Sequence, residues 1–337
     1  MTARAAEDRP PEAPALPAPA GTRARALGRL LVPVLLFAAF AALPAAADAL
    51  GQTFLVSFAT RVMILALAAM SLDLILGYGG LVSFGHAAFL GIGAYAVGIA
   101  AEEGLTEGLA VFPLAIAAAA LFALATGAVS LRTRGVYFIM ITLAFGQMAF
   151  FTAISLSAYG GDDGLTIWGR TEFLGGTPLE DDRAFYFVVL GCLAACYLLA
   201  RAIVASRFGR VLQAARQSPG RVAALGLDPF AYQLAAYAIA GGFAGLAGAL
   251  LANHTEFVSP AYMSWHRSGE LIVMVILGGM GSFHGAILGA IVYLGLEEAL
   301  SHLTEHWRLL FGPFLVLVVL HARGGLLSLL PVRPRDG

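Results

Sequence analysis

Long apolar stretches alternate with short polar or glycine-rich segments along most of the chain. Ten stretches can be distinguished, at residues 30–47, 53–76, 81–101, 109–130, 135–156, 184–204, 231–252, 269–282, 285–301 and 308–327. Most of them reach the roughly 20 residues that an α-helix needs to cross a hydrocarbon layer about 30 Å thick. The pattern therefore predicts an all-α polytopic membrane protein with about ten transmembrane helices. The eighth stretch is short, and the glycine-rich joint at 278–285 is compatible with a re-entrant turn, which needs protein or water around its backbone.

The composition supports this class and excludes several others. Hydrophobic residues make up 59% of the 337 residues and charged residues only 12%, about half the ~25% that is usual in soluble domains. A disordered, collagen-like or nucleic-acid-binding protein is excluded. All 20 residues counted as Lys or Arg are arginines, so the chain cannot complete a phosphate-binding loop of the G-x-x-x-x-G-K-[ST] type. Any step driven by ATP must therefore be powered by another chain.

The distribution of charge predicts the orientation. Ten crossings place both ends of the chain on the same side of the membrane. Arginines gather on that side, in clusters at 23–29, 132–134, 201–221 and 323–335. By the positive-inside rule this side is cytoplasmic. Acidic residues gather in the opposite loops, at 102–107 and 162–182.

These assignments divide the chain into a disordered cytoplasmic tail (1–29), a transmembrane domain (30–327) and a second cytoplasmic tail (328–337). The transmembrane domain includes an outer loop at 157–183 and a cytoplasmic loop at 206–229. An alternative for the start of the chain is a cleaved secretory signal, with the small residues at 45–47 as its cleavage site. Cleavage there would leave nine spans in the same orientation.

Two patterns typical of enzymes occur in unsuitable places. Residues 91–96 fit the dinucleotide-binding pattern G-x-G-x-x-[GA], but they lie inside an apolar span and not between a strand and a helix. His302, Glu305 and His306 fit the zinc-protease pattern H-x-x-E-H, but they lie in a short outer loop near the end of the chain. The pair Cys192 and Cys196 lies in one apolar run and is interpreted as helix packing. We therefore expect no metal or cofactor on this chain.

Glycine carries the strongest signal, with 40 residues concentrated in apolar runs. Some recur every fourth residue on one helix face, which permits close helix packing: Gly241 and Gly245, and Gly281, Gly285 and Gly289. Two glycine-rich segments, 77–95 and 278–290, also contain polar side chains. Close packing alone explains many of these glycines. The alternative is that both segments are broken helices whose backbone and polar side chains, Ser83, His86, Ser282 and His284, line a pathway.

The cytoplasmic loop at 206–229 predicts two short helices. The first begins near Ser206, and the second begins at Ser218 and Pro219, continues to Leu225 and ends at Gly226. A short helix outside the membrane with apolar side chains needs a surface to dock on. Anionic lipid is the alternative docking surface.

Five segments, in this order and spacing, carry a family resemblance. They are Leu76–Tyr95, Arg134–Phe138 with Thr142–Gln147, Gly161–Leu165, Ser206–Leu227 and Leu277–Ser282. Together they resemble the LivM-type permeases of branched-chain amino acid ABC importers, and the resemblance extends from about Thr60 to Leu327. The tail before Leu30 and the C-terminal end depart from the family pattern.

The resemblance implies a fold similar to the vitamin B12 and ribose importer permeases, in a bacterial plasma membrane. It implies a heterodimer with a LivH-type permease, two cytoplasmic ATPases that bind ATP-Mg, and an extracytoplasmic substrate-binding protein. The ATPase-coupling residues would be Arg216, Ser218, Pro219, Val222, Ala223, Ala224, Leu225 and Gly226. We expect Ser83, His86, Gln147 and Ser282 to face the pathway, and Asp162 and Asp163 to contact the binding protein.

Three other functions are compatible with parts of the sequence. Related permeases serve urea, short amides or aromatic acids. A stand-alone channel or secondary carrier would be active without ATPases, but the spans contain few of the buried charges that ion-coupled carriers use. An intramembrane enzyme would depend on His302, Glu305 and His306.

Overall fold

The computed structural model describes residues 22–173, 175–177, 179–303, 306, 309, 311–315 and 325–326. The α-helices are α1 (Thr22–Leu50), α2 (Phe54–Asp73), α3 (His86–Glu102), α4 (Gly108–Ser130), α5 (Val136–Ser155), α6 (Asp182–Ala205), α7 (Arg207–Gln217), α8 (Pro219–Ala224), α9 (Pro229–Thr255), α10 (Trp265–Gly278) and α11 (Phe283–Ser301). A π-helical turn, η1 (Leu74–Tyr78), continues α2, and the 3-10 turns are η2 (Ser157–Tyr159) and η3 (Pro260–Met263). The strands β1 (Leu165–Thr166) and β2 (Phe257–Val258) pair antiparallel.

Within the described residues, seven helices are long and apolar enough to cross a membrane. They cover residues 31–49, 54–78, 108–130, 136–155, 182–205, 229–255 and 283–301. The predicted spans 81–101 and 269–282 correspond to α3 and α10, whose 17 and 14 residues are shorter than a full crossing. The predicted span 308–327 lies mostly outside the described residues. The polytopic helical class is confirmed, whereas only seven of the ten predicted spans correspond to helices of sufficient length and hydropathy in the part of the chain that the structure describes.

The start of the chain differs from the prediction. α1 begins at Thr22, so the last residues of the predicted disordered tail, 22–29, are helical. Arginine and alanine favour helix, and this segment runs directly into an apolar span, so the helix extends beyond the apolar residues by about two turns.

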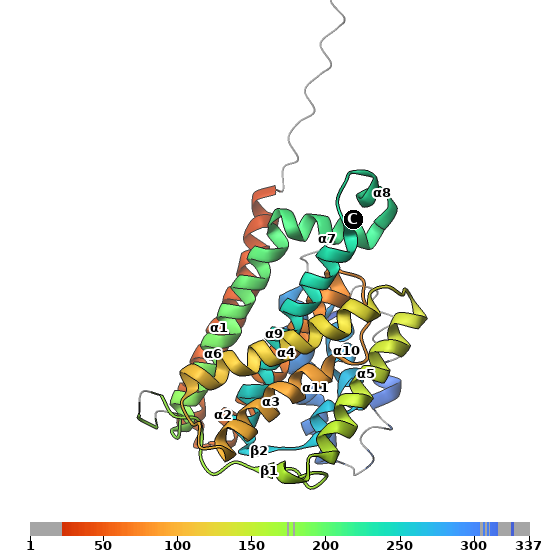
Figure 1. The fold of residues 1–337 in the computed structure, drawn as a ribbon. Helices are drawn as coiled ribbons and strands as arrows, with labels where there is room; N and C mark the ends of the chain where they lie inside the picture. Colours follow the sequence, from red (N-terminus) through yellow and green to blue (C-terminus); the bar gives the residue numbers. More distant parts are fainter. Residues whose placement is uncertain are drawn as a thin grey trace, which may run out of the picture.

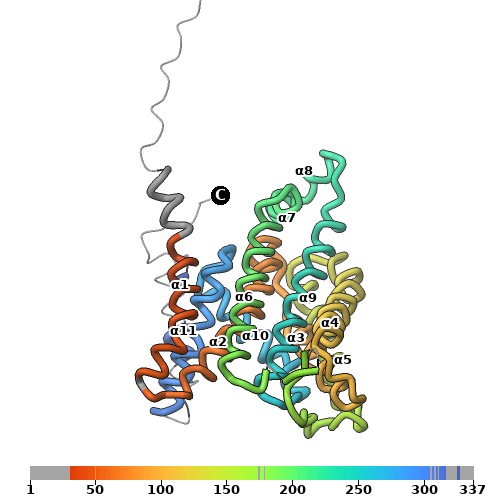
Figure 2. Tube along the Cα trace, turned by 90° about the vertical axis from the view of Figure 1, so that its left-hand side faces the viewer, coloured from red at the N-terminus to blue at the C-terminus, as the bar shows by residue number. Residues whose placement is uncertain are grey.

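The inner layer of the bundle consists of α2, α3 and α9. α2 is buried along almost its whole length from Ala59 onwards, and it packs against α6, α9, α10 and α11. α9 packs against α3 and α4. In Figure 2, α1 lies at one edge of the bundle and α4 and α5 at the opposite edge. Because the second half of α2 is enclosed by α6, α9, α10 and α11, its polar residues Ser71 and Asp73 are buried within the chain.

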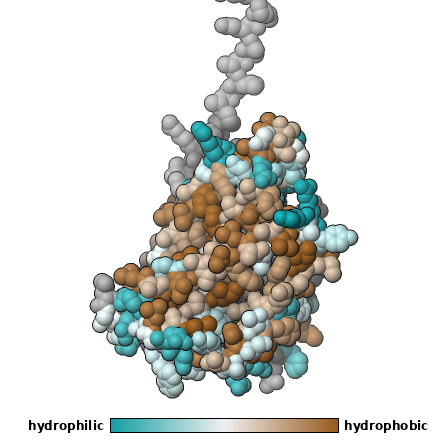
Figure 3. All heavy atoms as spheres, in the orientation of Figure 1, coloured by the Kyte–Doolittle hydropathy of each residue, from teal (hydrophilic) through white to brown (hydrophobic). Residues whose placement is uncertain are grey.

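The two ends of the bundle differ in structure. One end, which we call the α8 end, carries α7 and α8 and the start of α1, and the opposite end, the β end, carries β1 and β2 (Figure 1). Hydrophobic residues dominate the middle of the visible face and hydrophilic ones gather toward its two ends (Figure 3). This banding is expected for a protein whose middle lies in hydrocarbon and whose ends meet water.

Candidate functional site

The chain is not helical between η1 and α3, at residues 79–85, although neighbouring helices surround it. Two backbone amides near its end are satisfied by side chains from other helices. The amide of Phe84 donates to Thr142 Oγ1 of α5 at 3.2 Å, and the amide of Ala87 donates to Ser268 Oγ of α10 at 3.0 Å. Irregular backbone inside a membrane protein needs such internal partners because no water is available. The polar residues of α5 and α10 therefore hold the break in place.

Side chains of the same segment are tied to two more helices. Ser83 Oγ lies 3.2 Å from the hydroxyl of Tyr237 on α9, and His86 Nε2 lies 2.8 Å from Ser71 Oγ on α2. Ser83 and His86 are completely buried within the chain. In this conformation they contact other helices of the same chain and do not line an open surface. Their place in a pathway stays a prediction.

The other two predicted pathway residues lie on separate helices. Gln147 is half-buried on α5, next to Gly146, which packs against Gly85 of the broken segment. Ser282 caps the start of α11, where its Oγ accepts a hydrogen bond from the Gly285 amide at 3.3 Å. The four residues therefore do not form one cluster, although three lie in or beside the broken segment.

The two glycine-rich segments meet near the end of α2. Asp73 Oδ1 accepts a hydrogen bond from the Gly281 amide at 2.8 Å. A Cβ on Gly77 would lie 2.1 Å from Asp73 Oδ1 and 2.3 Å from the Gly281 nitrogen, so only glycine fits at residue 77. The sequence analysis did not identify Asp73 as a link between the segments. The only signal for Asp73 in the sequence was its position inside an apolar span. A carboxylate there is energetically costly and is therefore usually kept for a function.

α7 contacts the same region, where the two glycine-rich segments meet near the end of α2. The guanidinium Nη1 of Arg216 donates to the Gly77 carbonyl, and its aliphatic part packs on Gly80, where a Cβ would lie 2.7 Å from Arg216 Cγ. Gly80 has a φ of +70°, which favours glycine. A continuous set of contacts therefore runs from α7, through the broken end of α2, to the α10–α11 turn.

α8 has one buried side and one exposed side. Val222 is 4% exposed and faces the bundle, whereas Leu225 at the tip is 79% exposed. Ala223, Ala224 and Gly226 are exposed, and Ser218 and Pro219 are half-buried. The helix begins at Pro219, and the turn after it ends at Gly226, where φ is +80°, as the sequence predicted. The exposed side is a small apolar surface outside the bundle.

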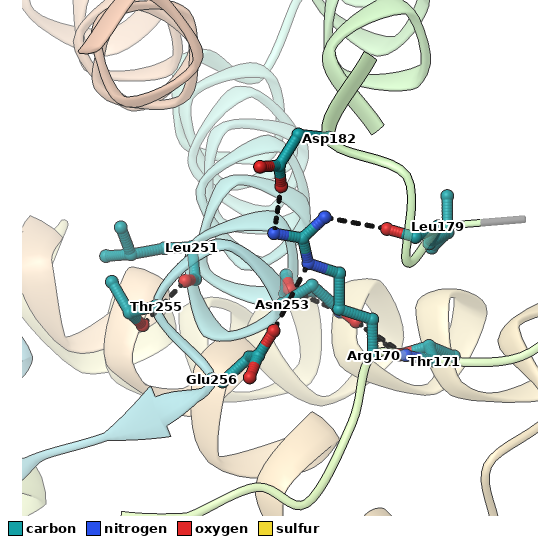
Figure 4. A network of polar contacts seen from close by, with 9 residues as sticks. Arg170, Thr171, Leu179, Asp182, Leu251, Asn253, Thr255 and Glu256 are labelled. Carbon is teal, nitrogen blue, oxygen red and sulfur yellow. Dashed lines mark hydrogen bonds and ion pairs between the residues drawn. The ribbon is translucent and has the colours of Figure 1, made fainter. Parts of the chain in front are cut away.

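At the β end, Arg170 joins the long loop between α5 and α6 to the helices. It donates to Asp182 Oδ1 at 2.6 Å and to the Leu179 carbonyl at 2.7 Å, and its Nε lies 3.5 Å from Glu256 Oε1, an ion pair without hydrogen-bond geometry (Figure 4). The guanidinium also lies over the Phe185 ring, 4.8 Å from its centroid. This one mostly buried cation connects the loop to α6 and to the end of α9.

A second contact holds the same loop. Asn253 Oδ1 on α9 accepts hydrogen bonds from the Thr171 amide at 2.8 Å and from its hydroxyl at 2.7 Å (Figure 4). The loop is therefore fixed at residues 170–171, while Asp162, Asp163 and Trp168 are exposed. Trp168 is 93% exposed. The sequence analysis did not select it, although a tryptophan in a polar loop is the available signal.

Replacing Arg170 with glutamine is expected to lower the free energy of unfolding by about 2 kcal/mol, because a mostly buried guanidinium loses its charged partners. Arg183→Gln is the matched control. Arg183 pairs with Asp48, but both side chains are about half exposed, and exposed ion pairs contribute only about 0–1 kcal/mol. Unfolding in detergent, followed by tryptophan fluorescence, measures both changes. Equal losses of stability in the two variants would contradict the role given to Arg170.

The packing glycines lie at close helix contacts. A Cβ on Gly241 or Gly245 would lie 2.5 Å from an alanine Cβ of α4, and a Cβ on Gly289 would lie 1.9 Å from the Met274 carbonyl of α10. A Cβ on Gly278 would lie 1.8 Å from the carbonyl oxygen of Gly285. Gly281 was predicted to share a helix face with Gly285 and Gly289, but it precedes α11 and has a φ of +77°. Small residues let backbones approach where helices have no hydrophobic driving force to associate.

The predicted enzyme patterns do not form a site in the described residues. No group of three or more His, Cys, Asp or Glu side chains that could hold a metal ion occurs among them. His302 pairs with Glu298 at 3.2 Å, and Glu305 lies outside the described residues. Cys192 and Cys196 are free thiols. Arg61, an arginine inside an apolar span, lies 3.8 Å from Glu297 of α11.

The fold and this site define a polytopic helical membrane protein of the permease class, with a broken helix in its centre and two short helices outside one end. The chain belongs to the family of permease components of branched-chain amino acid transport systems, whose sequence model matches residues 54–320. The resemblance to LivM-type permeases is thereby confirmed.

Individual relatives agree with this assignment. The chain is 30% identical to the high-affinity branched-chain amino acid transport system permease protein LivM of Escherichia coli K12 over 299 residues, which cover 81% of this chain and 70% of the relative. It is 23% identical to a LivM protein of Methanocaldococcus jannaschii over 79% of this chain and 91% of the relative. It is also 29% identical to the LivH permease of Escherichia coli K12, over 36% of this chain and 40% of the relative. No solved structure gives a significant match to the chain.

Proposed function

We propose that this chain is the permease subunit of an ATP-driven importer for branched-chain amino acids, and that it forms the translocation pathway together with a second, homologous permease. The names of the relatives support the substrate class. The observation that carries the ATP-driven part is the exposed apolar tip of α8, with Leu225 79% exposed on an arginine-rich helix pair. A self-sufficient channel has no need for such a surface.

Two ATPase subunits would supply the energy, with ATP-Mg bound on them and not on this chain. One of them would dock on α8, and the residues in contact would be Ala223, Ala224, Leu225 and Gly226, which are exposed. Val222 and Arg216 would instead tie the docked helices to the bundle, because Val222 is buried and Arg216, although exposed, bonds to the Gly77 carbonyl. This divides the predicted coupling residues into an outer and an inner group.

The second permease would be of the LivH type. The similarity of this chain to both LivM and LivH proteins supports a pair of related permeases that share one ancestral fold. The finer architecture is part of the proposal: ten spans, a fold similar to the vitamin B12 and ribose importer permeases, and a location in the bacterial inner membrane. The N-terminus would be cytoplasmic, because the arginine-rich α7 and α8 lie at the end where α1 begins. With ten spans, the C-terminus would lie on the same side.

A substrate-binding protein would dock at the β end. The exposed residues Asp162, Asp163 and Trp168 lie on a loop that Arg170 fixes to α6 and α9. A rigid platform with an exposed tryptophan fits protein recognition, because aromatic anchors dominate interface energies. Charge on such a surface chiefly affects the rate and selectivity of association.

Reversing both charges, by Asp162→Arg and Asp163→Arg, is expected to raise the concentration of binding protein that gives half-maximal transport by about tenfold, because like charges then oppose each other in the complex. Transport by the reconstituted importer as a function of binding-protein concentration measures this. The matched control reverses Glu103, which is also exposed but is bonded to Tyr159. An unchanged concentration dependence would leave Asp162 and Asp163 without a docking role.

The proposed function is tested by gentle purification of the tagged chain from its host, followed by reconstitution into proteoliposomes. Recovery of a second glycine-rich permease and P-loop ATPases, with ATP-dependent leucine, isoleucine and valine uptake, supports the proposal. Uptake of urea, short amides or aromatic acids instead would correct the substrate class. Transport by this chain alone, without ATP, would replace the proposal with a channel or carrier.

A further inference from the structure

Asp73 is only partly satisfied in its buried position. It is 0% exposed, its Oδ1 accepts a hydrogen bond from the Gly281 amide, and the Ser282 amide also lies near the carboxylate. Its Oδ2 has no hydrogen-bond partner among the described residues. A buried carboxylate with an unpaired oxygen is costly, so a donor that reached Oδ2 would lower this cost.

A cation lies close by but is not bonded to it. Arg216 enters from α7 and ends at the Gly77 carbonyl, while Gly77 lies against Asp73 Oδ1 on its other side. One glycine therefore separates the buried anion from the cation of the outer helices.

The backbone between them is able to rearrange. Gly77 belongs to the π-helical turn Leu74–Tyr78, and π-turns occur frequently at functional sites. Gly79 and Gly80 follow directly, and neither carries a side chain that would oppose a change of φ or ψ. A one-residue change between π-helix and α-helix would move the Gly77 carbonyl away from Arg216.

We infer that Arg216 moves between two positions, the Gly77 carbonyl and the Oδ2 of Asp73, when α7 and α8 shift during the transport cycle. In the second position Arg216 compensates the carboxylate, whose hold on the Gly281 amide weakens, so the α10–α11 turn is released. Asp73 and Arg216 are thus positioning residues that link ATPase docking to the inner helices. This inference rests on the proposed function, since it requires α8 to be moved by a partner.

The test uses the complete importer, with both permeases, the ATPases and the binding protein, in proteoliposomes. The quantity measured is substrate transported per ATP hydrolysed. Asp73→Asn keeps an acceptor for the Gly281 amide but removes the charge, and Arg216→Gln removes the cation. Each is expected to lower the ratio about tenfold or more, because a hydrogen bond to a buried charge is lost. ATP hydrolysis should stay within about twofold of the unmodified complex, since the ATPase sites lie on other chains.

Three further variants distinguish a contact that switches during transport from a fixed structural contact. The double variant should be no worse than either single one, because both remove the same interaction, and Arg216→Lys should restore part of the ratio that Arg216→Gln loses. Arg210→Gln, on the same helix but bonded only to the nearby Ala205 carbonyl among the described residues, is the control and should behave like the unmodified complex. An unchanged ratio in Asp73→Asn, or additive losses in the double variant, would overturn the inference.

A second measurement requires no substrate and covers the case in which Asp73→Asn fails to assemble. Hydrogen exchange of residues 279–282 is compared in the detergent-solubilised complex with and without trapped ATP. Exchange should rise on ATP trapping in the unmodified complex and not in Arg216→Gln. If trapped ATP changes exchange equally in the unmodified complex and in Arg216→Gln, the proposed movement of Arg216 is overturned. An unmodified complex that does not transport with ATP would instead overturn the proposed function.

Discussion

Replacing Leu225 with aspartate is expected to abolish ATP-dependent transport while leaving expression and membrane insertion unchanged. Leu225 is 79% exposed at the tip of α8, so the folded permease does not depend on it. In a complex the side chain would be buried, which contributes about 2 kcal/mol for a leucine, and an unpaired carboxylate in its place adds a further penalty. The combined loss predicts at least about a hundredfold weaker association with the ATPase.

Leu303→Asp provides a matched control. Leu303 is also 79% exposed, but it follows the end of α11 and does not belong to α8. The same change there should leave transport intact. Co-purification of the ATPases measures association, and uptake by proteoliposomes measures transport. Normal co-purification with Leu225→Asp would exclude α8 as the docking surface, and equal loss in both variants would indicate a general effect of surface charge.

The positions of the helices could be predicted from the sequence, because the length of an apolar run directly reflects the thickness of the membrane. The helices at the α8 end were predicted as well, since Ser218 with Pro219 is a strong start signal and Gly226 a strong stop signal. These are local properties of the chain. They need no knowledge of which helices are neighbours.

The contacts between helices could not be predicted in the same way. Asp73 and Gly281 are 208 residues apart, and an apolar periodicity tells which residues share a face but not which helix meets it. The glycines at 77 and 281 each indicated a close approach, yet only the structure shows that they approach each other. The partner of Arg61 on α11 was missed for the same reason.

Helix α3 shows where the length of an apolar run is misleading. The stretch 81–101 looks like a span, but α3 begins only at His86. The residues before it contain Gly79, Gly80 and Gly85, which disfavour helix, and their backbone is held by Thr142 and Ser268 from other helices. A hydrophobic run therefore predicts burial at membrane depth, but not that the whole run is helical.

Replacing Gly248 with alanine is expected to lower the free energy of unfolding by about 2 kcal/mol, even though alanine adds only one methyl group. A Cβ at this position of α9 would lie 1.8 Å from the Leu90 carbonyl of α3. Backbone cannot rotate away as a side chain can, so the two helices must separate, and overpacking of this kind costs about 1–3 kcal/mol or more. Alanine's better helix propensity, about 1 kcal/mol, offsets part of that cost.

Gly191→Ala on α6 is the matched control and should have the opposite sign. Nothing lies within 4 Å of a Cβ at Gly191, so only the helix propensity changes, and stability should stay the same or rise slightly. Thermal unfolding of both variants in one detergent measures the difference. If Gly248→Ala is as stable as Gly191→Ala, α3 and α9 can separate without cost. The broken segment that precedes α3 would then not be held rigidly by helix packing, and its side-chain hydrogen bonds would have to fix its position alone.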